Sequence, residues 1–128
     1  RPVKFVAVQD FGMPMNKLTA RSQINGGIIM GISWALCEDR TMDPNTGLMV
    51  NPNMENYKLA GTMETPEIEV VIDEMPERGP IGLGEPPRIP TAGALATAVY
   101  NATGAWVRRM PMTPDVVLEA LANKGGAR

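Results

Sequence analysis

Hydrophobic and polar residues follow two different periods along the chain. In residues 67–73 the apolar side chains occupy nearly every second position, which is typical of a half-buried β-strand. In residues 22–39 an apolar residue recurs at every fourth position, which predicts a helix with one buried face, capped by Ser22. A short run of mainly apolar residues, 3–8, predicts a further strand that is mostly buried.

Two shorter helices are expected in the second half of the chain. Thr91 can cap a helix with an alanine-rich face, and Gly104 ends it because glycine is common just after a helix. Thr113 can cap a last helix over residues 116–121. The order of strand, helix, irregular segment, strand, loop and two helices indicates an α+β fold.

We divide the chain into one ordered portion, residues 1–123, and a tail, residues 124–128, that we expect to be disordered. The long irregular segments inside the ordered portion are unusual for a compact domain, so we expect them to pack on parts of the protein that this chain lacks. The first residue, Arg1, is not Met and no signal peptide follows it, so an upstream part is expected to be missing. A cytoplasmic location is expected, with the periplasm as an open alternative.

Composition limits the kinds of site that the chain can build. There is no histidine, the commonest metal ligand and general base, and the single cysteine, Cys37, cannot ligate an iron–sulfur cluster alone. With a net charge of −2, the chain lacks the excess of basic residues that is typical of nucleic-acid-binding proteins. The longest apolar stretch, residues 24–37, falls short of the roughly 20 residues of a membrane helix. No metal site made of side chains is therefore expected, and acid–base chemistry falls to groups such as carboxylates.

Glu85 is the most informative candidate for a residue with a chemical role. It lies between the flexible residues 82–84 and two prolines, which restrict both their own φ angles and the conformation of Glu85. Gly84 allows a bulky group to come close to the backbone. One interpretation is a carboxylate held in one direction toward a ligand. The other is a surface loop with a solvated glutamate.

Gln23 is the second candidate, at the expected start of the first helix. Free backbone N–H groups at a helix start attract anions, and the amide of Gln23 offers both a donor and an acceptor to a heterocycle. The nearby Gly26, Gly27 and Gly31 indicate that another backbone or a ligand approaches closely. The alternative is a capped helix that packs tightly in a protein core.

Three segments, taken together and in this order, resemble the molybdenum-binding subunits of the xanthine dehydrogenase and aldehyde oxidoreductase family. Residues 8–31 contain Ser-Gln-Ile-Asn-Gly-Gly, similar to the family's Gly-Gln-x-x-Gly-Gly. Residues 82–92 contain Gly-Leu-Gly-Glu-Pro-Pro, similar to Gly-Val-Gly-Glu-Pro-Pro, and residues 110–118 are similar to the closing Leu-Pro-x-Thr-Pro-Glu-x-Val-Leu. Ser22, in place of the usual Gly, and Ile81, where many members have Lys, depart from the pattern.

The resemblance implies roles for the candidate residues. Glu85 would be the general base that takes a proton from the Mo–OH group, after which that oxygen attacks an aldehyde or N-heterocycle and hydride passes to sulfur. Gln23 would hydrogen-bond the molybdenum-pterin cofactor, for which a cytosine dinucleotide form is one candidate, and Gly84 would lie against it. The rest of the molybdenum subunit would complete the cavity. [2Fe–2S] centres and FAD would lie on partner domains or subunits.

Three functions therefore stay open. The first is a fragment of a molybdenum hydroxylase, inactive when isolated, with Glu85 as base. The second is a non-catalytic α+β interaction module whose glycine-rich loops contact a protein partner. The third is a family-like subunit that has lost activity, against which the presence of Glu85 argues.

Overall fold

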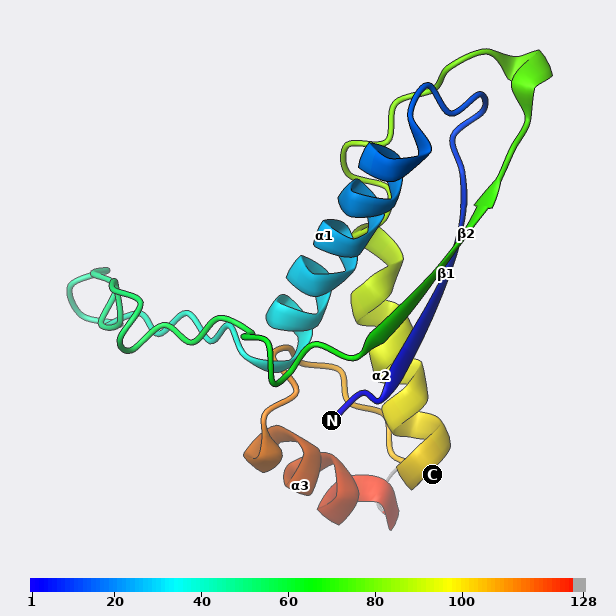
Figure 1. The fold of residues 1–128 in the computed structure, drawn as a ribbon. Coiled ribbons are helices and arrows are strands. Elements are labelled where there is room, and N and C mark those ends of the chain that lie inside the picture. The colour runs from blue at the N-terminus through cyan, green and yellow to red at the C-terminus, as the bar shows by residue number, and fades with distance from the viewer. Residues whose placement is uncertain (126–128) are drawn as a thin grey trace.

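The computed structural model describes residues 1–125 and builds them from three α-helices and a two-stranded sheet, which is the predicted α+β class (Figure 1). The elements in chain order are β1 (Lys4–Asp10), α1 (Lys17–Leu36), β2 (Glu67–Asp73), the 3₁₀ turn η1 (Pro76–Arg78), α2 (Ile89–Thr103), α3 (Pro114–Ala122) and the 3₁₀ turn η2 (Asn123–Gly125). Within these described residues no helix is both long and apolar enough to cross a membrane.

The two strands pair in parallel, from Lys4 opposite Glu67 to Asp10 opposite Asp73. Both α1 and α2 lie on the same side of this sheet, and α1 belongs to the connection between the strands (Figure 1). The bounds of β2 are those predicted from the alternation of apolar and acidic residues. Ile68, Val70 and Ile72 join the core while the residues between them, including Val71, are exposed, so the prediction of a half-buried strand is confirmed.

The prediction that β1 is mostly buried is wrong. Its side chains alternate between the core and solvent, and Val6 and Val8 are 53% and 69% exposed. Both faces of a parallel sheet are usually covered by helices. Within residues 1–125 the helices cover only one face, so the valines on the other face of β1 have no neighbouring layer.

Helix α1 begins earlier than predicted. The side chain of Asn16 accepts hydrogen bonds from the N–H groups of Leu18 and Thr19 at 3.0 and 3.1 Å, so Asn16 is the N-cap. Ser22 lies inside the helix and donates its hydroxyl to the Leu18 carbonyl. The predicted apolar period begins only in the second turn, and a first turn that is exposed except at Ala20 precedes it. Gln23 therefore lies in the second turn, not at the free N–H groups of a helix start.

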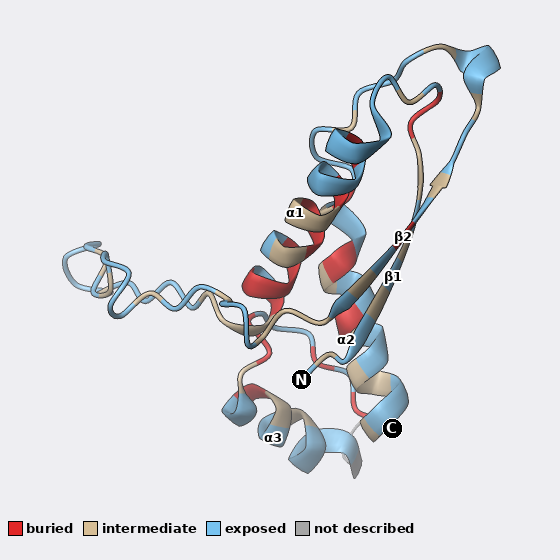
Figure 2. Cartoon of the chain, in the orientation of Figure 1, coloured by how far each residue is buried: buried red, intermediate tan, exposed pale blue. Residues whose placement is uncertain are grey.

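The predicted buried face of α1 is confirmed. Ile24, Ile28 and Ile32 are completely buried in the core that α1, α2 and the sheet share (Figure 2). The predicted close approach is also confirmed at two of the three glycines. A Cβ at Gly27 would come within 2.9 Å of Pro87, and one at Gly31 within 2.5 Å of Thr91, whereas nothing lies within 4 Å at Gly26.

Thr91 is not the cap of α2. The helix begins at Ile89, and Thr91 lies within it, fully buried against Gly31, where its hydroxyl donates to the Pro87 carbonyl. A threonine close to a helix start can thus serve as a packing residue instead of a cap. The predicted end is confirmed, because Gly104 takes the left-handed conformation with φ of 68°.

The C-terminal part follows the predicted order. Thr113 is the N-cap of α3, as expected, although its side chain makes no capping hydrogen bond. The tail was expected to be disordered from residue 124, but Lys124 and Gly125 belong to η2, and the Lys124 ammonium group donates to the Thr103 carbonyl. The remainder of the tail, residues 126–128, lies outside the described residues.

Between α1 and β2 an irregular arm, residues 38–66, projects away from the helices (Figure 1). The Ala60 N–H donates to the Ser33 hydroxyl of α1 and so anchors the arm to the helix, while within the arm the Tyr57 hydroxyl donates to Glu38. Large apolar side chains on the arm are exposed, among them Leu48 and Met54. An arm of this kind is the long irregular segment that the sequence led us to expect.

We expect Gly31→Ala to destabilise the protein and Gly26→Ala to do so much less or to stabilise it. At Gly31 the added methyl group overlaps Thr91, and overpacking of this kind costs about 1–3 kcal/mol. At Gly26 the methyl group meets open space and improves helix propensity by up to about 1 kcal/mol. Urea unfolding of both variants measures the difference. Equal stability of the two would contradict the packing described between α1 and α2.

Candidate functional site

The structure brings the three candidate residues to one place. Gln23 of α1 donates its side-chain Nε2 hydrogen to the carbonyl oxygen of Gly84 at 2.5 Å, across 61 positions of sequence. Glu85 follows directly. The two candidate segments, which the sequence suggested separately, therefore form one local structure beside the start of α2.

The packing of Pro87 on α1 positions the loop that carries Glu85. Pro87 is buried, and it lies against the backbone of Gly27, where a side chain would collide with it. The backbone N–H of Arg88 donates to the Glu85 carbonyl at 3.0 Å, which closes the turn between Glu85 and α2. A residue larger than glycine at position 27 would thus move the loop. Gly27 acts on the site through this contact, which is the close approach that the sequence predicted for it.

The carboxylate of Glu85 faces solvent among the described residues, with 70% of the side chain exposed. Its Oε1 atom forms an ion pair with Nη2 of Arg88. The open space around the loop continues at Gly82 and Gly84, where a Cβ would meet nothing within 4 Å. A bulky group can therefore approach this backbone, and the carboxylate of Glu85 is accessible as well.

Sequence reasoning missed two residues of this region, Arg88 and Trp34. Arg88 pairs with Glu85 and lies over the ring of Trp34, with 5.2 Å between its Cζ atom and the ring centroid. The spacing of three residues between Glu85 and Arg88 was the available signal for the pair. Asn25 has a buried side-chain oxygen with no hydrogen-bond partner among the described residues, but it lies two positions from Gln23 along α1 and therefore on another face of the helix. No local pattern marks either Trp34 or Asn25.

Other groups do not add catalytic or metal-binding chemistry. Burial raises the pKa of the Cys37 thiol, and the nearby Glu64 raises it further, so the thiol stays protonated at neutral pH. Among residues 1–125, no group of three or more His, Cys, Asp or Glu side chains is arranged to hold a metal ion.

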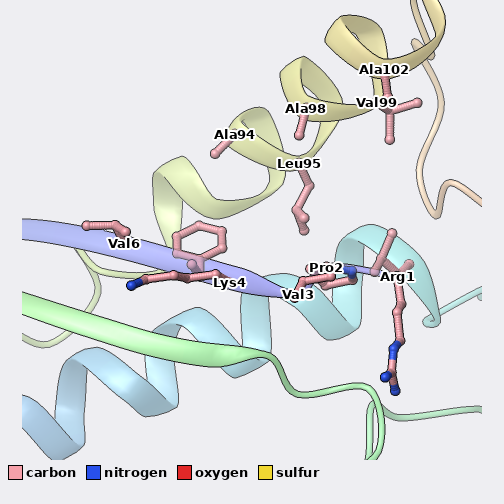
Figure 3. A pocket seen from close by; sticks show the side chains of 12 residues that line it. Arg1, Pro2, Val3, Lys4, Val6, Ala94, Leu95, Ala98, Val99 and Ala102 are labelled. Atoms are coloured by element: carbon pink, nitrogen blue, oxygen red, sulfur yellow. The ribbon is translucent and has the colours of Figure 1, made fainter.

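A separate apolar cavity of about 560 Å³ lies between β1 and α2 (Figure 3). Leu95, Val99 and several alanines of α2 line one wall, and Val3 and Val6 belong to the other. Neither Gln23 nor Glu85 borders this cavity, so it is not the candidate site. Its lining is suited to apolar side chains of another segment.

The residues at the candidate site fit one part of a large polar cofactor. The Gln23 amide uses a donor for the Gly84 carbonyl, which leaves its side-chain oxygen as an acceptor for a ligand. The unobstructed backbone at Gly84 provides the surface for close approach. These groups can contact a cofactor from one side but cannot enclose it.

Comparison with known proteins identifies the family of the chain. Residues 1–66 match the model of the molybdopterin cofactor-binding domain. The chain is 38% identical over 120 residues to the xanthine dehydrogenase molybdenum-binding subunit of Escherichia coli, a match that covers 91% of this chain and 16% of that subunit.

Solved structures show the same fold. The quinoline 2-oxidoreductase of Pseudomonas putida superposes with a TM-score of 0.86 and 27% identity over 94% of this chain and 16% of its own. The aldehyde oxidoreductase of Desulfovibrio desulfuricans gives a TM-score of 0.81 and 36% identity over 92% of this chain and 13% of its own. The chain thus spans about a sixth or less of the length of these proteins. It belongs to the molybdopterin cofactor-binding domain family and corresponds to a part of the molybdenum-binding subunit of xanthine dehydrogenase and aldehyde oxidoreductase type enzymes.

Proposed function

We propose that this chain forms one wall of the cofactor cavity of a molybdenum hydroxylase and supplies its general base, Glu85. The observation that carries the proposal is the junction of α1 with the glutamate loop. Gln23 donates a hydrogen bond to the Gly84 carbonyl, and Pro87 packs against Gly27, so the loop that carries Glu85 is held against α1. An exposed carboxylate beside open backbone is suited to face a cofactor that the chain itself only partly surrounds.

Glu85, Gln23 and Gly84 each have a separate proposed role. When bound, a molybdenum-pterin group supplies the two-electron oxidising centre. Glu85 takes the proton of the water-derived hydroxyl that attacks the substrate carbon, which makes that oxygen a stronger nucleophile. Gln23 offers its amide to the polar edge of the pterin, and Gly84 lets the cofactor approach the backbone.

The substrate is proposed to be an aldehyde or an N-heterocycle, since the relatives are described as xanthine, aldehyde and quinoline enzymes. [2Fe–2S] centres and FAD on partner domains or subunits would take the electrons. One candidate for the form of the pterin cofactor is the cytosine dinucleotide.

The remainder of the molybdenum subunit is the proposed main partner of this chain. It would cover the outer face of β1, where Val6 and Val8 are exposed, and the apolar side chains of the arm, residues 38–66. The cavity between β1 and α2 offers a third apolar contact (Figure 3). The competing function, a non-catalytic interaction module, uses the same apolar surfaces but predicts no molybdenum in the complete subunit.

Glu85→Gln in the complete, cofactor-loaded subunit is expected to keep its molybdenum content and lose turnover. The amide keeps the size of the side chain but cannot take a proton, and a positioned general base contributes roughly 10²–10⁴-fold. Steady-state turnover and metal analysis measure the two effects. Glu77→Gln, at an exposed carboxylate on η1, is the matched control and should behave as wild type. Turnover of Glu85→Gln within a few-fold of wild type would exclude Glu85 as the base.

Gln23→Ala is expected to lower cofactor occupancy while the melting temperature hardly changes. The side chain is exposed and alanine favours helix, so the loss of stability should stay within about 0.5 kcal/mol, as for most surface substitutions. Molybdenum content per subunit and a thermal melt separate the two effects, with Ser22→Ala as the neighbouring control. A lower melting temperature with full molybdenum content would show that Gln23 only supports the loop.

The 128-residue chain on its own is expected to bind no molybdenum cofactor and to form oligomers. The site is open on one side, and exposed apolar surface of this extent usually marks an absent partner. Elemental analysis and the mass in solution test both expectations. A monomer that carries the cofactor and turns over an aldehyde would show that the chain needs no further part of the subunit.

A further inference from the structure

Arg88 connects Glu85 to helix α1. Its guanidinium group pairs with the Glu85 carboxylate and lies over the indole ring of Trp34, 5.2 Å from the ring centroid. Trp34 lies on α1, between the buried residues Ser33 and Ala35, and is itself 44% exposed. The carboxylate, the cation and the aromatic ring therefore form a continuous series from the loop to the helix.

The Arg88 pair differs from the other ion pairs in the described part of the chain. The Arg88 side chain is 27% exposed, whereas the cations of the other pairs are 48–60% exposed. It is also the cation that lies over an aromatic ring. An arginine stacks its flat face on an aromatic ring while its N–H groups stay free to bind a carboxylate, which lysine cannot do equally well.

We propose that Arg88 is the positioning residue of Glu85, with Trp34 as the platform that holds its guanidinium group. This inference rests on the proposed role of Glu85 as the base. The ion pair uses Oε1 of Glu85, so Oε2 is left to accept a proton. A glutamate that is 70% exposed would otherwise sample several rotamers, and a base that points away from the reacting atoms contributes little.

The backbone reinforces this arrangement. The N–H of Arg88 donates to the Glu85 carbonyl at 3.0 Å, so the two residues keep a constant separation in the turn. Pro87, between them, is packed on Gly27 of α1. Both ends of the series, the turn and Trp34, are thus fixed to the same helix. A change at Trp34 should therefore reach Glu85 through Arg88.

The first test measures the contacts without any activity, in the 128-residue chain. Trp106→Phe leaves Trp34 as the only tryptophan and keeps an aromatic ring opposite Tyr100. In this background Arg88→Met should increase the acrylamide quenching of Trp34 fluorescence, because the ring loses its cover. Glu85→Gln should increase it as well, because the guanidinium loses its ion partner. Lys58→Met, which removes a distant exposed ion pair with Glu64, is the control and should change nothing.

The quenching results can overturn the proposal directly. If Arg88→Met increases quenching and Glu85→Gln does not, the stack exists without a link to the carboxylate, and Arg88 does not position Glu85. If neither variant changes quenching in a chain whose circular dichroism is that of the parent, the series of contacts itself is absent.

The second test uses the complete, cofactor-loaded subunit. Arg88→Met should lower kcat by roughly tenfold while KM and molybdenum content stay unchanged, because only the direction of the base is affected. Arg88→Lys should recover part of this loss, since lysine keeps the charge but not the flat, forked group. Trp34→Leu should lower kcat in the same direction, and Lys58→Met should match wild type.

The outcomes separate this inference from the proposed function. A normal or increased kcat in Arg88→Met, together with an inactive Glu85→Gln, would refute positioning by Arg88 and leave Glu85 as the base. Wild-type turnover in Glu85→Gln would refute both. An equal loss in Arg88→Met and Arg88→Lys with reduced molybdenum content would assign Arg88 a purely structural role and overturn the inference.

Discussion

The close contact between α1 and the segment that enters α2 supports the rest of the structure. Gly27 and Gly31 leave the space that Pro87 and Thr91 occupy, and the buried isoleucines of α1 complete the same face. Protein interiors are packed densely, so a side chain at either glycine would displace its neighbour instead of filling a void. Helix packing and the position of the glutamate loop therefore depend on the same contact.

The candidate base is held by its surroundings and not by its own burial. Glu85 stays largely exposed, yet the turn that carries it is tied to α1 through Pro87 and through the bond from Gln23 to Gly84. Functional residues often lie on such loops, where a rigid scaffold positions a side chain that remains accessible. The stack of Arg88 on Trp34 adds a connection at the level of side chains.

Much of the remaining surface has the features of a surface that other parts of the protein cover. The parallel strands are covered on one face, the arm of residues 38–66 projects with apolar side chains exposed, and an apolar cavity lies open beside β1. Parallel sheets are normally covered on both faces. These features agree with a chain that spans about a sixth of the subunits it resembles.

The sequence by itself determined the elements whose signal is local. The alternation in residues 67–73 predicted β2 to the residue, and the spacing of Ile24, Ile28 and Ile32 predicted the buried face of α1. Glu85 and Gln23 were recognisable as candidates from neighbouring glycines and prolines and from the family resemblance. Only the tertiary structure decided that these two segments meet, that Thr91 packs against Gly31, and that Arg88 links Glu85 to α1. Such contacts join residues far apart in the chain and depend on how two helices pack, which no local period or spacing encodes.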